Sequence, residues 1–311
     1  MSLTSPIDTT TITRRTLLAA ASLARAEEDS IPIIDTHFHL YDQTRPQGAP
    51  YPFVPNSPPF LPRDFRESAK PLGIVGGIEV EASPWIEDNL WVLMMIENEP
   101  MIVGTVGNID PTKPEFSQYL DRYHRNKLFL GIRFGNVWKE EENLVTAIDK
   151  PLVIENMKAL AQTGLTLEVA NPRLDLTEAT LRLTDKVPGL RIVLGHLQAL
   201  PLPTDRQLLK RYSDNLKELR TRNVYAKVSG LPKANPQAPF DPVVYKPMLD
   251  FIWEIFGEDF IVYAGRNKQA LDILKTYTMA LGRPAADKFF WKNSIPAFKW
   301  VARSPEQPRL S

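Results

Sequence analysis

The sequence predicts an α/β protein that folds as a single (β/α)8 barrel, and two observations carry this prediction. Short apolar runs rich in Ile, Val, Leu and Phe alternate with longer amphipathic segments, which is typical of a parallel sheet buried on both faces. An open, doubly wound sheet would show the same alternation. However, polar or ionisable residues follow several of the apolar runs, and in a barrel such strand ends converge on one mouth. The barrel is therefore favoured.

Eight apolar runs are predicted to form the strands, because they are short, rich in β-formers and separated by helical patterns. They are Pro32–His37, Ile74–Glu81, Ile102–Asn108, Phe129–Phe134, Leu165–Val169, Arg191–Gly195, Val224–Ser229 and Phe260–Tyr263. The predicted helices include Trp85–Asn98, Phe116–Asn126, Leu152–Gln162, Glu178–Lys186, Asp205–Arg222 and Tyr245–Phe256.

Composition limits the partners and the chemistry. Lys plus Arg and Asp plus Glu are both 37 in the 311 residues, so there is no net field to gather nucleic acid or an anionic membrane. We expect a small-molecule substrate, no nucleic-acid partner and no membrane partner, and the sequence leaves homo-oligomerisation open. The chain contains no cysteine, which excludes disulfides, thiolate chemistry and cysteine zinc sites.

The first 26 residues are predicted to be an export leader rather than part of the barrel. Thr13-Arg14-Arg15-Thr16-Leu17-Leu18 resembles a twin-arginine signal, and a short apolar run leads to a small-x-small site at Ala24-Arg25-Ala26. Cleavage there would leave residues 27–311 as one barrel domain in the periplasm or outside the cell. The alternative is an uncleaved arm on a cytoplasmic protein.

Three histidines are candidates for the catalytic groups. His37 and His39 end the first apolar run, and alternate residues of an extended segment share a face. Imidazoles placed in this way can ligate a divalent metal, or polarise a carbonyl and move protons; the other interpretation is two hydrogen-bonded core histidines. His196 follows the sixth run and is the third candidate, whereas His124 is expected on a helix surface.

Charged residues at other strand ends are candidates for substrate binding. Arg133 could hold a substrate carboxylate through its bidentate fork, or pair with Glu168 or Glu81. Lys227 could contact substrate or neutralise a carboxylate in the barrel. Glu79 and Glu81 share a face, and if buried they would need partners such as Arg133 or Lys227.

Five short motifs occur in order along the chain and together resemble one family. They are Asp35-Thr36-His37-Phe38-His39, Glu81-Ala82-Ser83-Pro84-Trp85, Gly131-Ile132-Arg133, Val193-Leu194-Gly195-His196-Leu197 and Lys227-Val228-Ser229-Gly230-Leu231. From about Ile31 to Arg303 the chain resembles the amidohydrolase-related family that contains 2-pyrone-4,6-dicarboxylate lactonase and the sugar-acid lactonases. The resemblance implies a TIM barrel that opens lactones or related rings, in some members without a tightly bound metal. It also implies that His37, His39 and His196 are the active-site histidines and that Arg133 is a basic substrate-binding residue.

The eighth strand departs from the family pattern. Family members usually end it with Gly-Ser-Asp-Trp-Pro or Gly-Ser-Asn-Trp-Pro, but here Ala264-Gly265-Arg266-Asn267-Lys268 follows the strand. Arg266 takes the acidic position without a gap, and Asn267 takes it with one inserted residue; neither is a general base. An Arg beside three imidazoles is expected to lower their pKa values and to repel a divalent cation.

Three functions are consistent with these residues. The first is a hydrolase of carbohydrate catabolism that opens a sugar-acid or carboxylated lactone. In it, His37 and His39 polarise the carbonyl, and water attack is helped by His196 or by a carboxylate such as Glu81 or Glu168. The second is an amidohydrolase or decarboxylase in which the three histidines hold one divalent metal such as zinc. The third is a barrel that has lost catalysis and acts as a binding protein.

Overall fold

The strands form one eight-stranded parallel sheet in which β1 to β8 follow each other in sequence order. The computed structural model describes residues 30–48, 57–134, 143–170, 172–197, 202–231 and 240–310, and the predicted leader, residues 1–26, lies outside them. The strands are β1 (Ile33–Phe38), β2 (Ile74–Val80), β3 (Ile102–Gly107), β4 (Phe129–Phe134), β5 (Thr166–Ala170), β6 (Arg191–Gly195), β7 (Val224–Ser229) and β8 (Ile261–Ala264).

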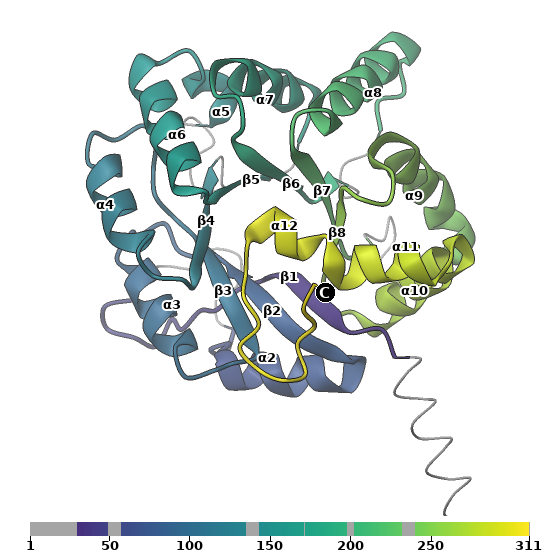
Figure 1. Cartoon of the computed structure of the whole chain (residues 1–311), viewed down its shortest axis with the longest axis horizontal. Coiled ribbons are helices and arrows are strands. Elements are labelled where there is room, and N and C mark those ends of the chain that lie inside the picture. The colour runs from purple at the N-terminus through teal and green to yellow at the C-terminus, as the bar shows by residue number, and fades with distance from the viewer. Residues whose placement is uncertain are drawn as a thin grey trace, which may run out of the picture. The chain divides into compact units, whose positions relative to one another are not determined.

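Helices follow the strands and lie around them (Figure 1). They are α2 (Pro62–Ala69), α3 (Asp88–Ile96), α4 (Phe116–Tyr123), α5 (Leu144–Ala147), α6 (Pro151–Thr163), α7 (Leu174–Lys186), α8 (Arg206–Arg220), α9 (Pro242–Phe256), α10 (Lys268–Leu281), α11 (Arg283–Asp287) and α12 (Ser294–Phe298). Two single turns, η1 (Lys70–Leu72) and η3 (Lys288–Lys292), complete the set in the described residues.

Side-chain hydrogen bonds join the first and last strands and bring the sheet round into a nearly closed barrel. Thr36 Oγ1 on β1 donates to the Tyr263 carbonyl on β8 at 2.7 Å, and the Gly265 N–H, just after β8, donates to Asp35 Oδ1 at 2.7 Å. The predicted (β/α)8 barrel is confirmed. Every predicted strand agrees with the observed one to within one residue at each end.

The chain's last segment closes the amino-terminal end of the barrel. Thr166 Oγ1, at the start of β5, donates to the Ala297 carbonyl of α12 at 2.7 Å. Asn293 Nδ2 donates to the Ile261 carbonyl at the start of β8 (2.9 Å), and Gln307 Nε2 to the Val75 carbonyl of β2 (3.2 Å). In Figure 1 this yellow segment crosses the view near the strands. The opposite end, where the strands' carboxyl ends lie, is therefore the one left for a substrate.

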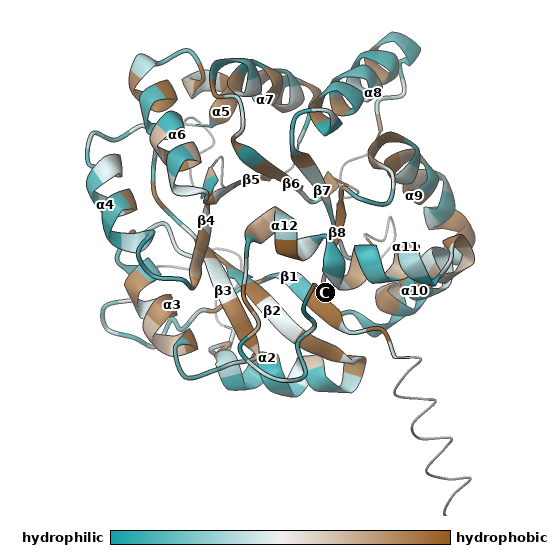
Figure 2. Cartoon of the chain, viewed as in Figure 1, coloured by the Kyte–Doolittle hydropathy of each residue, from teal (hydrophilic) through white to brown (hydrophobic). Residues whose placement is uncertain are grey.

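Hydrophobic burial explains why these segments form strands and helices. Every residue of β3 and β5 is buried, as expected for strands packed on both faces. On α8, Tyr212, Leu216 and Leu219 are the buried positions, spaced so that they share one helix face. Figure 2 shows hydrophobic residues along the strands and mixed colours on helices such as α6 and α8.

One glycine brings two charged positions together. A Cβ on Gly131 of β4 would lie 2.2 Å from the Thr166 carbonyl oxygen of β5, so only a residue without a side chain fits there. The resulting register sets Arg133 directly opposite Glu168 on the neighbouring strand.

Among the described residues, no helix is both long enough and apolar enough to cross a membrane.

Candidate active site

Three imidazoles meet at the carboxyl end of the barrel. His37 is on β1, His39 comes just after it, and His196 follows β6. The ring centroids of His37 and His39 are 4.9 Å apart, and those of His37 and His196 are 4.4 Å apart. The extended backbone of β1 puts His37 and His39 on one face, and the barrel brings β6 to the same end.

Two of the rings have a clear partner for Nδ1. His39 Nδ1 lies 2.7 Å from the Val80 carbonyl oxygen at the end of β2. A carbonyl oxygen only accepts, so neutral His39 carries its proton on Nδ1 and leaves Nε2 as an acceptor. His196 Nδ1 lies 2.5 Å from the Ser229 hydroxyl on β7, and a hydroxyl can donate or accept.

The backbone at His196 is unusual. Its φ is +61°, in the left-handed region that residues other than glycine rarely adopt. Such a conformation costs about 1 kcal/mol or more and persists only where the surroundings impose it. The turn lets the chain leave β6 with the His196 ring against His37 and Ser229.

A buried ion pair lies beside His37. Lys227 Nζ on β7 donates to Glu168 Oε2 on β5 at 2.5 Å and to the Thr36 carbonyl at 2.8 Å, and both charged side chains are 0% exposed. Burial alone would raise the pKa of Glu168, but the Lys227 charge, the His37 contact and the Arg133 charge outweigh it and hold this pKa well below its ordinary value. Burial lowers the pKa of Lys227, and Glu168 opposes that shift. Glu168 is therefore a carboxylate at neutral pH.

Arg133 on β4 lies between two carboxylates without a close bond to either. Its Nη1 is 3.9 Å from Glu81 Oε1 and its Nε is 4.0 Å from Glu168 Oε1, with the side chain 10% exposed. Its Nε makes no hydrogen bond within the described part of the chain. The guanidinium is thus placed to add a bond to an anionic ligand at the mouth.

The imidazoles are neutral at pH 7. Burial lowers the pKa of His37 well below its ordinary value. Burial, and then the Arg133 charge, lower the pKa of His39 to about 4 and that of His196 to about 3. Neutral imidazoles can accept protons from a reacting group.

Arg266, which the sequence placed beside the three imidazoles, contacts Asp35 and a group of aromatic rings. Its Nη1 is 3.3 Å from Asp35 Oδ2, and its guanidinium lies 5.0–5.3 Å from the ring centroids of Phe38, Phe60 and Phe65. Asp35 thereby holds Arg266 against β1 and α2. The lowering of the histidine pKa values comes first from burial and then, for His39 and His196, from Arg133; Arg266 adds a smaller lowering at His39.

Asn267, the other candidate after the eighth strand, caps a helix. Asn267 precedes α10, and its side-chain oxygen accepts from the Ala270 N–H at 3.0 Å. Asn267 is exposed. An N-cap of this kind satisfies a helix N–H that would otherwise lack a partner.

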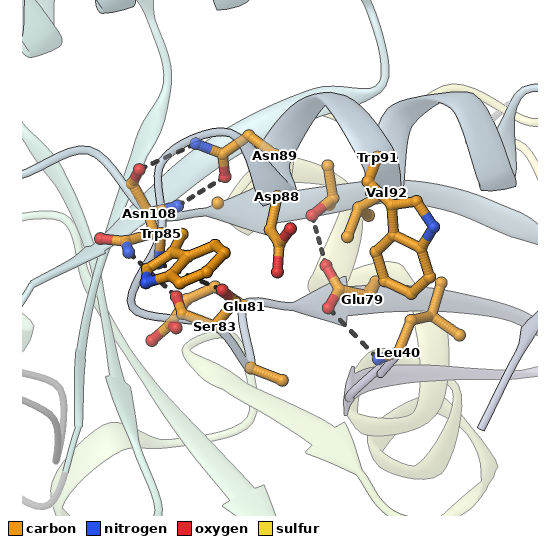
Figure 3. A pocket seen from close by; sticks show the side chains of 13 residues that line it. Leu40, Glu79, Glu81, Ser83, Trp85, Asp88, Asn89, Trp91, Val92 and Asn108 are labelled. Atoms are coloured by element: carbon orange, nitrogen blue, oxygen red, sulfur yellow. Dashed lines mark hydrogen bonds between the residues drawn. The ribbon is translucent and has the colours of Figure 1, made fainter. Parts of the chain in front are cut away.

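The two glutamates at the end of β2 have different surroundings (Figure 3). Glu79 Oε2 is 2.5 Å from Thr105 Oγ1, and Glu79 Oε1 accepts from the Leu40 N–H at 3.4 Å. The sequence suggested partners such as Arg133 or Lys227 for these glutamates if buried; Glu81 lies 3.9 Å from Arg133, whereas the partners of Glu79 are Thr105 and Leu40. No cation of the described segments forms an ion pair with Glu79, and burial raises its pKa to about 8. Both glutamates line a cavity of about 10 Å³, which has room for roughly one water.

Asp35 and Ser229 contact the histidines of the candidate site, although the sequence did not point to them. Asp35 accepts from the Gly265 and His37 N–H groups, and Ser229 contacts His196. Strand alternation was the available signal, because Asp35 shares a face with His37 and Ser229 shares a face with Lys227.

The described arrangement does not form a metal-holding group. Within the part of the chain that the structure describes, no three or more His, Cys, Asp or Glu side chains are placed to hold a metal ion. Imidazole nitrogens are suitable donors for zinc. However, Arg133 and Lys227 put positive charge around the three rings, and Asp35 is paired with Arg266.

Comparison with known families identifies the class of protein. The family described as amidohydrolase matches residues 34–265, which is most of the barrel. The chain belongs to the amidohydrolase family. No curated protein matches it significantly.

Solved structures share the fold at low sequence identity. A Burkholderia multivorans amidohydrolase with bound zinc has a TM-score of 0.71 at 16% identity, covering 86% of this chain and 99% of that one. A probable 2-pyrone-4,6-dicarboxylic acid hydrolase from Acinetobacter baumannii, with citric acid bound, has a TM-score of 0.66 at 14% identity, covering 86% and 99%. A 5-carboxyvanillate decarboxylase from Novosphingobium aromaticivorans, complexed with manganese, has 0.63 at 16% identity, covering 88% and 97%.

Proposed function

We propose that the protein is a hydrolase that opens a cyclic ester, either a sugar-acid lactone or a carboxylated lactone. The observation that carries this proposal is the meeting of three neutral imidazoles with Arg133 at the carboxyl end of the barrel. The fold it shares with a probable pyrone dicarboxylic acid hydrolase that binds citric acid supports a carboxylated ligand.

The chemistry divides between the neutral and the charged side chains. A water oxygen attacks the ring carbonyl carbon, the ring C–O bond breaks, and the ring oxygen leaves as a hydroxyl after receiving a proton. Neutral imidazoles move the protons, while Arg133 compensates negative charge on the carbonyl oxygen or on a substrate carboxylate. His39 presents only an acceptor at Nε2. We therefore assign carbonyl polarisation to Arg133 rather than to His39.

The test is hydrolysis of a panel of aldonolactones and pyrone carboxylates, followed by acid release, with and without added zinc or manganese. We expect His37→Gln to lower the rate at least 100-fold, the low end for loss of general acid–base catalysis. His124→Gln is the matched control, because His124 contacts the Leu120 carbonyl on α4, and it should keep the wild-type rate. If no lactone opens faster than in buffer, the proposal fails.

A second candidate is a metal-dependent amidohydrolase or decarboxylase. It is favoured by the donor chemistry of His37, His39 and His196, and by the zinc and manganese in two structures of the same fold. Elemental analysis of protein grown with added zinc distinguishes the two candidates. One metal ion per chain supports the metal enzyme.

A third candidate follows from the segment after the eighth strand, where the family resemblance leads us to expect an acidic residue. The sequence has Arg266 or Asn267 there, and Arg266 is paired with Asp35. A barrel without catalysis would bind the same small molecules and leave them intact. Calorimetric binding of a lactone that the protein does not hydrolyse would support it.

A further inference from the structure

His37 has two candidate partners for the same ring nitrogen. Its Nδ1 lies 3.4 Å from Glu168 Oε1 and 3.5 Å from Lys227 Nζ. The carboxylate requires a proton on Nδ1, whereas the ammonium requires a lone pair there. The two contacts therefore correspond to opposite tautomers of the neutral ring.

Hydrogen-bond accounting distinguishes the two tautomers. Lys227 Nζ donates two of its three hydrogens to Glu168 Oε2 and to the Thr36 carbonyl, and the Phe298 ring, whose centroid is 5.2 Å away, offers the ammonium a further contact. Glu168 Oε1 is buried and accepts no hydrogen bond from any described residue, and an unsatisfied buried carboxylate oxygen is costly. A proton on His37 Nδ1 supplies the missing donor. The opposite tautomer would leave this oxygen unsatisfied.

We propose that Glu168, anchored by Lys227, holds the proton of His37 on Nδ1 and thereby makes His37 Nε2 the general base of the reaction. The inference rests on the proposed hydrolase function and assigns one residue to a step that it leaves open. The attacking water gives its proton to Nε2, and the imidazolium returns that proton to the leaving ring oxygen. Glu168 and Lys227 are positioning residues, since they act through His37.

The other two histidines lack this support. The Nδ1 partner of His39 is a backbone carbonyl and that of His196 is a hydroxyl, both uncharged. Among the contacts of the described residues, His37 is the one of the three rings that faces a carboxylate at Nδ1. A carboxylate there stabilises the imidazolium that forms when the ring accepts a proton. Lys227, and Arg133 at 4.0 Å, keep Glu168 ionised although it is buried.

The test is Glu168→Gln, which keeps the shape of the side chain and removes its charge. The Lys227 ammonium will retain the amide oxygen, which turns the amide NH₂ towards His37 Nδ1 and moves the ring proton to Nε2. Nitrogen-15 NMR of histidine-labelled protein reads the tautomer directly, with His37 assigned by the signal lost in His37→Gln. We expect the proton on Nδ1 in the wild type and on Nε2 in the variant. We also expect kcat to fall at least 100-fold, with KM changed less than about threefold.

Glu99→Gln is the matched control, because Glu99 is also a buried carboxylate, but it precedes β3 and pairs with Arg66 rather than with a histidine. It should leave the His37 tautomer and kcat unchanged. A proton on Nε2 of wild-type His37 overturns the inference. This measurement is made on the wild-type protein, so it does not depend on whether a variant folds. A Glu168→Gln protein with wild-type kcat overturns it as well. Failure of the wild type to open any lactone overturns the proposed function, and with it the base role, whatever the tautomer.

Discussion

Glu79 is a buried carboxyl group whose hydrogen bonds come from the neutral Thr105 hydroxyl and the Leu40 N–H. Glu81, two residues further along the chain, lies near the Arg133 guanidinium instead. The two side chains share a strand face, yet a two-residue step along β2 takes the carboxyl group towards a cation. At the scale of single residues, the local surroundings of Glu79 therefore raise its pKa.

We predict that Glu79→Gln makes stability less sensitive to pH. The folded pKa of about 8 lies above the ordinary value of 4.5. Between these values the unfolded chain releases the proton and the folded chain retains it, so stability falls as pH rises through this range. Glutamine cannot ionise. Thermal unfolding at pH 5 and pH 8 should show a Tm decrease that is smaller in the variant by at least about 2 °C; equal decreases would contradict the raised pKa.

Arg266 acts at the scale of elements, because it joins the end of β8 to β1 and α2. The side chain is 23% exposed, pairs with the fully buried Asp35 and lies over three aromatic rings. The hydrogen bonds from Thr36 and Gly265 join the same two strands. Arg266 thus contributes to closing the barrel.

We predict that Arg266→Asp destabilises the protein by roughly 1–3 kcal/mol and gives no lactonase activity. The substitution removes the partner of a buried carboxyl group and adds a second negative charge beside it. Urea unfolding measures the loss, with Lys268→Asp as a control at an exposed position two residues away. An Arg266→Asp protein of unchanged stability that opens lactones faster would show instead that this site is a catalytic centre that has lost its acidic residue.

At the scale of the whole molecule, we propose that residues 1–26 direct export and are then removed. The twin-arginine pair Arg14-Arg15 and the small-x-small site ending at Ala26 are the motivation. The exported protein expressed in bacteria should begin at Glu27 by intact mass, and replacing both arginines with lysine should keep the full-length chain in the cytoplasm. An uncleaved cytoplasmic product from the natural sequence would contradict export.

Helices that depend on distant contacts were the least predictable part of the fold. The α11–α12 segment consists of short helices that contact the amino-terminal ends of strands far away in sequence, for example through Asn293 and Ala297. The predicted start of α7 was also four residues late, at Glu178 rather than Leu174. Periodicity is weak in such short or terminal stretches, and tertiary packing decides their structure.

By itself the sequence determined the barrel, its strands and the candidate histidines, because apolar alternation and strand-end polarity are local properties of the chain. Only the tertiary structure decided which side chains form ion pairs and hydrogen bonds with one another. Arg266 pairs with Asp35, Lys227 pairs with Glu168, and Glu79 bonds to the Thr105 hydroxyl. Each of these outcomes depends on strand register and on burial across the barrel, which join residues up to 231 positions apart. Hydrogen bonds and close ion pairs form between atoms that are near in space, and no local pattern of the sequence encodes which distant residues come together.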